Sequence, residues 1–207
     1  MPDSNQYHHR PSDSPLGEWA WDRRYAEHPW PNEPDSTLIE FVSALSPGKA
    51  LDLGCGPGRN AIWLARQGWD VTGVDASVVG LAQAEARAAG SGVTLRLIAG
   101  DILAYQPPAA QFDLIVLANI HLAPEQRSPF FLSLASALAP GGHLFVTGHH
   151  LESLGRAGPP DPERLYTEER LADLFPTLHV EHLGRHEKER PNEHPLVDIV
   201  VWATRTA

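Results

Sequence analysis

The chain has 207 residues, a formal net charge of −10 and one cysteine, with 42% hydrophobic and 20% charged residues. This composition predicts a globular protein with one sizeable core, and a single cysteine excludes a disulfide within the chain. The sequence contains no basic cluster suited to phosphates, no apolar run approaching the ~18 residues of a membrane span and no secretory signal, so we expect a cytoplasmic protein without nucleic-acid or membrane partners.

The N-terminal part of the chain precedes any regular pattern. Residues 1–17 are polar and rich in Pro, Ser, Asp and His, which predicts a disordered tail. The aromatic-rich residues 19–34 have two interpretations, a helical arm docked on the core or a lid over a ligand. A helix capped by Asp35 or Ser36 should then run to about Leu45.

From residue 50 onward, short apolar runs alternate with segments of helical spacing. This alternation indicates right-handed crossovers and a parallel sheet. The run FDLIVLA is typical of a central strand covered on both faces. The predicted strands are 50–53, 71–74, 93–98, 112–118 and 143–147, and the predicted helices are 60–67, 78–90 and 129–138.

The pattern changes after Gly148. A loop rich in Gly and Pro leads to Thr167, which can cap a short helix. Two strands follow at about 178–186 and 196–204, and their connection is too short for a crossover helix, so they should form an antiparallel hairpin at the sheet edge. The sequence therefore predicts an α/β fold with a doubly wound, mostly parallel, seven-stranded sheet.

The segment LDLGCGPGRN supplies the clearest functional motif. It places Gly54, Gly56 and Gly58 between a strand and a helix, where glycine permits a sharp turn and close approach of a ligand. Asp75 ends the second strand, 21 positions after Gly54. An acidic residue at about that spacing accepts hydrogen bonds from ribose hydroxyls in doubly wound folds. The expected ligand therefore contains a ribose.

The third glycine of the dinucleotide-binding pattern is absent. Arg59 stands at its position, and a bulky side chain there argues against the close helix packing of a dinucleotide site. A further acidic residue, Asp101, follows the third strand in the segment AGDI.

Five motifs together resemble the class I S-adenosylmethionine-dependent methyltransferases: LDLGCGPGRN, VTGVDAS, AGDI, FDLIVLANIHL and LAPGGHLFVTG, in that family's order and spacing. The resemblance implies a Rossmann-like fold and S-adenosyl-L-methionine as cofactor. It divides a single domain at 18–207 into an arm or lid (18–47), a cofactor-binding core (48–150) and a substrate loop with the C-terminal hairpin (151–207).

The resemblance also implies roles for individual residues. The three glycines would contact the methionine part of the cofactor, Asp52 would reach its amino group, Asp75 would hold the ribose, and Asp101 would accept from the adenine amino group. Asn119 would lie at the mouth between cofactor and substrate. The full predicted cofactor set is Asp52, Gly54, Cys55, Gly56, Gly58, Arg59, Asn60, Asp75, Ala76, Asp101, Ile102 and Asn119, with a buried apolar role as the alternative for Cys55.

A narrower resemblance concerns the tellurite-resistance and related small-molecule methyltransferases. GRNAIWLARQGWDVTGVDAS, NIHLAPEQR and the aromatic N-terminal arm are similar to that group, which implies a soft sulfur, selenium or tellurium acceptor. The segment RPNEHPLVDIVVWA departs from the group's final hairpin, which leaves the acceptor open.

Candidate catalytic and substrate-binding residues come from the predicted strand ends and the arm. His121, just past the fourth strand, is the first candidate base, and His149 and His150, just past the fifth, come next. All three lie where open α/β sheets bind ligands, and each could remove a proton from an acceptor or serve a structural role. Adjacent histidines on a strand point to opposite faces, and we expect no metal site. The candidate substrate-binding residues are Tyr25, Trp30 and Tyr166, with core or lid packing as the alternative.

The predicted function is methyl transfer from S-adenosylmethionine to a small-molecule acceptor by a monomer or homodimer. A non-catalytic, regulatory S-adenosylmethionine-binding protein fits the same motifs. A nucleotide-dependent oxidoreductase is disfavoured by Arg59 and by the terminal hairpin.

Overall fold

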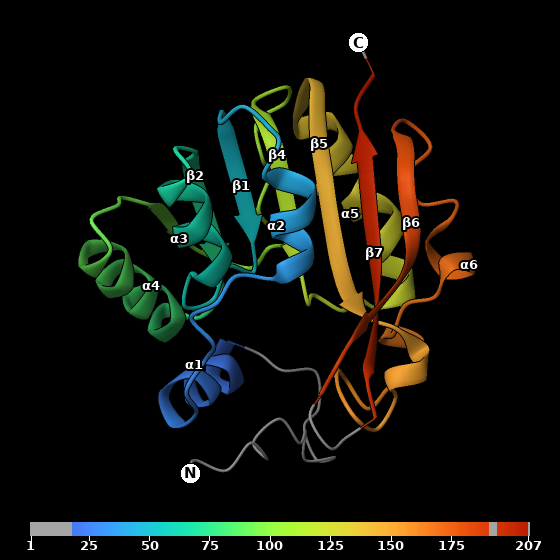
Figure 1. The fold of residues 1–207 in the computed structure, drawn as a ribbon, viewed down its shortest axis with the longest axis horizontal. Helices are drawn as coiled ribbons and strands as arrows, with labels where there is room; N and C mark the ends of the chain where they lie inside the picture. Colours follow the sequence, from blue (N-terminus) through green and yellow to red (C-terminus); the bar gives the residue numbers. More distant parts are fainter. Residues whose placement is uncertain (1–17, 191–193, 207) are drawn as a thin grey trace.

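The computed structural model describes residues 18–190 and 194–206, so the predicted tail at 1–17 lies outside the described part (Figure 1). Most elements agree with the sequence pattern. The helices are α1 (Glu18–Glu27), α2 (Ser36–Val42), α3 (Arg59–Arg66), α4 (Val78–Gly90), α5 (Pro124–Ala137) and α6 (Glu168–Leu171). The strands are β1 (Lys49–Leu53), β2 (Asp70–Asp75), β3 (Arg96–Ala99), β4 (Phe112–Ala118), β5 (Leu138–His149), β6 (His179–Lys188) and β7 (Leu196–Thr204), with short 3₁₀ helices η1 (Leu151–Ser153) and η2 (Pro162–Arg164).

The seven strands form one sheet in the order β3-β2-β1-β4-β5-β7-β6. The first five in this order run parallel, whereas β7 lies antiparallel between β5 and β6. The predicted doubly wound, mostly parallel sheet with a terminal hairpin is therefore confirmed. The reversed β7 ends the series of crossovers and brings the C-terminal hairpin beside β5.

Helices cover both faces of this sheet (Figure 1). On one face, Leu38 of α2 and Leu64 of α3 pack with Phe145 of β5. On the other, Phe131 and Leu134 of α5 belong to a second buried cluster. A sheet buried on both faces explains why β4 is an almost continuous apolar run. None of the described helices is long and apolar enough to cross a membrane.

The two largest differences between expected and observed boundaries have identifiable reasons. Helix α5 begins at Pro124 rather than at Pro129, because the first helical turn tolerates a proline and Pro124 also fits there. Pro129 then lies inside the helix. The segment Pro140–Gly142, expected as a turn, continues β5, because Gly141 and Gly142 exchange backbone hydrogen bonds with Arg205 at 2.8 and 2.9 Å.

Candidate functional site

The glycine turn after β1 has the backbone conformation that its sequence predicts. Gly54, Gly56 and Gly58 have φ angles of +71°, +49° and +84°, a left-handed region that other residues rarely adopt. A Cβ atom on Gly56 would lie 2.6 Å from the hydroxyl oxygen of Tyr25, and one on Gly54 would meet the side chain of Ile120. The turn is therefore tightly covered, and only glycine fits these positions without displacement of a neighbour.

Asp75 fastens this turn to the start of α4. Its carboxylate accepts hydrogen bonds from the backbone N–H groups of Gly56 at 2.7 Å and Ser77 at 2.8 Å. Burial raises the pKa of Asp75 above its usual value, and the two backbone donors oppose that rise. Each carboxylate oxygen retains acceptor capacity, so Asp75 can also accept from ligand hydroxyls.

Asp52 lies on β1, buried in the same region. Its side chain is 2% exposed, and its Oδ2 atom has no hydrogen-bond partner among the described residues. Burial raises its pKa to about 7, the carboxylate of Asp75 adds to the rise, and Arg59 opposes it. A buried carboxyl with an unsatisfied oxygen suits a cationic group of a bound ligand, because such a group would supply the missing partner.

The remaining predicted cofactor positions continue along the carboxyl ends of the strands. Asp101 is exposed after β3, and its Oδ1 accepts from the N–H of Leu103 at 2.9 Å. Ile102 packs against the core, and Ala76 is half-buried after β2. Asn119 follows β4 with φ +59°. This row fits an extended ligand lying across β1 to β4, although individual contacts stay predictions.

Three members of the predicted cofactor set point elsewhere. Asn60 accepts a hydrogen bond from the N–H of Asp35 at 2.9 Å, and Arg59 lies 3.8 Å from the carboxylate of Asp35. Cys55 is buried, with its sulfur 2.9 Å from where a Cβ on Gly73 would lie. The geometry therefore gives these side chains structural contacts, with α2 and the sheet, that their motif alone did not indicate.

The aromatic arm covers the cofactor side of this edge. Asp22 of α1 accepts hydrogen bonds from Ser77 Oγ at 2.5 Å and Val79 N at 3.2 Å. Tyr25 is 7% exposed and packs edge-on against Trp30, with ring centroids 5.3 Å apart. Both aromatic residues thus belong to a docked helical arm, and their predicted contact with a substrate stays a prediction.

A stack of three rings lies at the carboxyl ends of β4 and β5, beside the predicted cofactor positions. His121 lies between His149 and Tyr166, with centroid distances of 5.1 and 5.6 Å. Nε2 of His121 accepts a hydrogen bond from the backbone N–H of His149 at 2.9 Å. His150 lies outside this stack, is 3% exposed and accepts from Glu152 N through Nδ1, which caps η1. The structure thus brings two of the three candidate histidines together.

Tyr166 is fully buried behind His121. Its hydroxyl donates to the carbonyl of Ile120 at 2.7 Å, and the guanidinium of Arg127 lies 5.1 Å from its ring centroid. Tyr166 therefore supports the stack from behind, and direct contact with a substrate would require movement of the loop that precedes it. Arg127 was not a sequence candidate, and its place in an ordinary helix gives no signal of this contact.

Sequence reasoning also missed two residues beside His149. Nδ1 of His149 lies 2.7 Å from Oδ1 of Asp198, and the second carboxylate oxygen of Asp198 lies 2.7 Å from the ammonium of Lys188. Asp198 is completely buried. An aspartate within the apolar run LVDIVVWA was a signal that could have found it, because a buried charge needs a partner.

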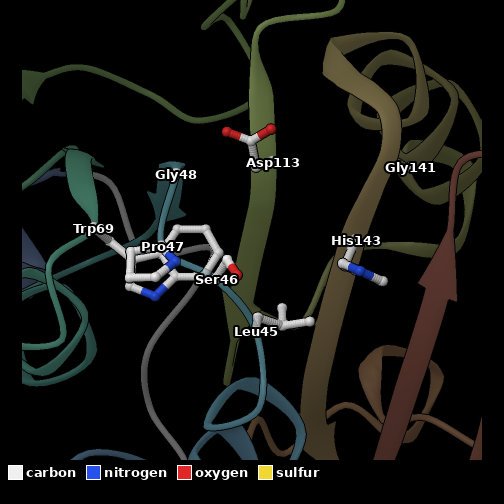
Figure 2. Close-up of a pocket in the computed structure, with 8 residues that line it drawn as sticks. All are labelled: Leu45, Ser46, Pro47, Gly48, Trp69, Asp113, Gly141 and His143. Atoms are coloured by element: carbon white, nitrogen blue, oxygen red, sulfur yellow. The ribbon is translucent and has the colours of Figure 1, made fainter.

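A separate hollow of about 380 Å³ lies at the opposite edge of the sheet (Figure 2). It is lined by Leu45, Ser46, Pro47, Gly48, Trp69, Asp113, Gly141 and His143, so it lies at the amino ends of β1 and β4. None of the predicted site residues lines it. Among residues 18–190 and 194–206, no cluster of three His, Cys, Asp or Glu side chains could hold a metal ion.

Sequence comparisons agree with this geometry. Residues 50–142 match the model of a methyltransferase domain. The chain is 39% identical over 108 residues to the ribosomal RNA small subunit methyltransferase C of Alcanivorax borkumensis, covering 50% of the chain and 33% of that protein. It is 38% identical over 115 residues to the trans-aconitate 2-methyltransferase of Rhizobium meliloti, covering 55% and 43%. The chain thus spans less than half the length of these curated relatives.

Solved structures extend the likeness over most of the chain. The N-methyltransferase NodS of Bradyrhizobium japonicum in complex with S-adenosyl-L-homocysteine has a TM-score of 0.70 at 20% identity, covering 92% of this chain and 98% of that one. TehB of Haemophilus influenzae has a TM-score of 0.69 at 20% identity, covering 91% and 67%. At such identity the likeness concerns the fold alone, so the narrower tellurite-resistance resemblance stays a prediction. Together, the domain match over residues 50–142 and the fold identify a Rossmann-like methyltransferase domain in this chain, similar to S-adenosylmethionine-dependent methyltransferases of known structure.

Proposed function

We propose that the protein transfers a methyl group from S-adenosylmethionine to a small-molecule acceptor. The observation that supports this function is the paired arrangement at the ends of β1 and β2. A left-handed glycine turn is tied by Asp75, and the unpartnered oxygen of Asp52 lies buried beside it. The first presents backbone whose own residues carry no side chain, covered in this structure by Tyr25 and Ile120, and the second favours a cationic group.

The cofactor supplies an electrophilic methyl group on a positively charged sulfur when it is bound. The protein then has to hold and align two partners and exclude water, and alignment alone can contribute up to about 7–11 kcal/mol. Asp75 and Asp101 would hold the nucleoside and the glycine turn with Asp52 the methionine part, while the docked arm keeps water from that half. The loop after β5 would bound the acceptor.

Two observations favour a small acceptor. The chain is acidic, which disfavours a polyanionic substrate such as RNA. The loop after β5, which would bound the acceptor, is held in place by Arg170, which donates to the carbonyls of Pro162 and Leu165 at 2.6 and 3.0 Å. One relative is named as a ribosomal RNA methyltransferase and another as a trans-aconitate methyltransferase, so the relatives alone leave the acceptor open.

Isothermal titration with S-adenosylhomocysteine tests the cofactor half. Asp75→Ala should weaken binding at least about 100-fold, since two hydrogen bonds to a charged group contribute about 1.5–3 kcal/mol each. Asp70→Ala is the matched control, because Asp70 is exposed at the other end of the same strand, and its affinity should stay within about twofold. Equal affinities in the two variants would contradict the ribose assignment.

Turnover with a panel of phenols, thiols, selenite and tellurite then tests catalysis. Methylated product with any of these acceptors supports the enzyme. Tight binding of S-adenosylhomocysteine with no product across the panel would instead favour a regulatory protein that only binds the cofactor.

A further inference from the structure

We propose that His149 is the base that accepts a proton from a protic acceptor, a hydroxyl or thiol, and that Asp198, held by Lys188, positions its imidazole for that task. This inference rests on the proposed methyl transfer and names the acceptor chemistry of the same site. It selects His149 among three histidines, of which the sequence placed His121 first.

The hydrogen bond between His149 and Asp198 determines the imidazole tautomer. Burial alone would raise the pKa of Asp198, but the hydrogen bond from His149 and the ammonium of Lys188 hold that pKa well below its usual value. Asp198 is therefore a carboxylate and can only accept, so Nδ1 of His149 carries the proton at 2.7 Å. Nε2 is then left with its lone pair, the form in which an imidazole acts as a base.

The second nitrogen of the ring, Nε2, is not occupied by a partner among the described residues. The His149 side chain is 19% exposed, and no hydrogen bond to Nε2 joins it to any residue that the structure describes. The ring stacks on His121, which follows β4 and adjoins Ile120. Ile120 in turn contacts the glycine turn at Gly54. The ring of His121 therefore separates His149 from Ile120, which borders the cofactor half.

The other two histidines are less suited to this task. Nε2 of His121 already accepts the backbone N–H of His149, and protonation there would break that bond. His150 is buried, with Nδ1 accepting from Glu152 and Nε2 lying 3.3 Å from Glu168. Because His150 is only 3% exposed, an acceptor molecule has no access to either of its nitrogens.

Charged groups on three elements surround His149. Asp198 lies opposite it on β7, Lys188 reaches the same carboxylate from β6, and His186 pairs with Asp198 in the β6–β7 register. His121 faces it from the loop after β4, and Gly158 of the covering loop adds no charge. Lys188 compensates the charge of the buried carboxylate, so Asp198 stays available to accept a hydrogen bond from Nδ1 of His149.

The reaction balances with this assignment. The acceptor O–H or S–H bond breaks as its proton passes to Nε2 of His149, and the acceptor atom forms a new bond to the methyl carbon. The carbon–sulfur bond of the cofactor breaks, with its electron pair remaining on sulfur, and His149 later releases the proton to water. An acceptor that is already an anion, such as tellurite, would gain nothing from the base.

Two substitutions test the assignment by kinetics. For phenol and thiol acceptors, His149→Gln should lower kcat about 10²–10⁴-fold with little change in affinity for S-adenosylhomocysteine. The rise of kcat/KM with pH that the base produces should disappear. His179→Gln replaces an exposed histidine at the start of β6 and serves as control, with unchanged kinetics. Equal kcat for His149→Gln and wild type would overturn the proposal while leaving the methyltransferase function intact.

An NMR experiment decides without any acceptor. Long-range ¹H–¹⁵N spectra of the ¹⁵N-histidine protein with S-adenosylhomocysteine should show His149 at pH 8 with a proton on Nδ1 and none on Nε2. Asp198→Asn should shift the population toward the Nε2–H tautomer and lower kcat, because an amide can donate to Nδ1 where the carboxylate cannot. A proton on Nε2 in the wild-type protein would overturn the assignment. Failure of S-adenosylhomocysteine to bind would instead refute the proposed function itself.

Discussion

The candidate site at the carboxyl ends of the strands has two halves, which are formed by different parts of the chain. In the cofactor half, a glycine turn with left-handed backbone is tied by one carboxylate, so the site is mainly backbone. In the acceptor half, the rings of His121, His149 and Tyr166 stack, and arginines hold the neighbouring loop through backbone carbonyls. A backbone site is encoded by local spacing, whereas a side-chain site depends on partners that meet only after folding.

The two halves are nevertheless connected by charge. Lys188 bridges Asp198 of the acceptor half to Asp35, the N-cap of α2, at 2.7 and 2.9 Å. The carboxylate of Asp35 also pairs with Arg59, and the backbone N–H of Asp35 donates to the side chain of Asn60. Arg59 and Asn60 directly follow the glycine turn. The terminal hairpin is thus fastened to the first helix of the cofactor motif, which gives the two halves a fixed relative position.

Tyr166→Ala should give the largest effect and act on the acceptor half. Removal of a fully buried ring leaves a cavity, and such substitutions cost about 3–5 kcal/mol in the free energy of unfolding. Tyr166→Phe removes only the hydroxyl that donates to the carbonyl of Ile120, and it should lower the free energy of unfolding by about 1 kcal/mol. Urea unfolding measures both. If the halves are built separately, the folded fraction of Tyr166→Ala still binds S-adenosylhomocysteine within a few-fold of wild type; a far larger loss would show that the ring stack also shapes the cofactor half.

Gly56→Ala should have an intermediate effect on the cofactor half. Its control is Gly155→Ala, because Gly155 has a similar left-handed φ of +76° but open space where a Cβ would lie. The control should cost only the conformational penalty, about 1–2 kcal/mol. Gly56→Ala should cost more, since its Cβ would lie 2.6 Å from the Tyr25 hydroxyl.

Thermal unfolding and titration with S-adenosylhomocysteine measure this difference. Adding Tyr25→Phe to Gly56→Ala removes the nearest atom and should recover part of the loss. If Gly56→Ala and Gly155→Ala proved equally costly, contact between the arm and the turn would contribute nothing, and the arm would be a loose lid.

Much of the fold could be predicted from the sequence because its signals are local. Ser77 caps α4 and Thr167 caps α6 as expected, since a hydroxyl followed by a helical pattern is a short-range signal. The start of α5 was missed because two prolines, Pro124 and Pro129, both suit a first turn, and packing decides between them. The extension of β5 depends on Arg205, far away in sequence.

The candidate site divides in the same way. The positions of Gly54, Gly56 and Asp75 follow from spacing, and the structure joins Gly56 to Asp75 by a hydrogen bond. The partner of His149 could not be identified from the sequence, because Asp198 is 49 residues away. It becomes a neighbour of His149 only when β7 pairs with β5. Arg59 and Asn60 lie within the motif, yet their side chains contact Asp35, which no local pattern indicates.

The smallest expected effect is a pH dependence of cofactor affinity through Asp52. Burial raises its pKa to about 7, so its neutral form is favoured in the folded protein without ligand. The stability that this neutral form contributes is present below the unfolded pKa and is lost as the pH rises through about 7. Binding a cationic amino group favours the carboxylate, so affinity for S-adenosylhomocysteine should increase over that same range.

One pH unit below 7, about a tenth of Asp52 is ionised, and the dissociation constant should be roughly tenfold higher than its plateau. Titrations at pH 6, 7 and 8 measure this slope, and Asp52→Asn should remove it. A slope that persists in Asp52→Asn would assign the titrating group to another residue and leave the cofactor half purely a backbone site.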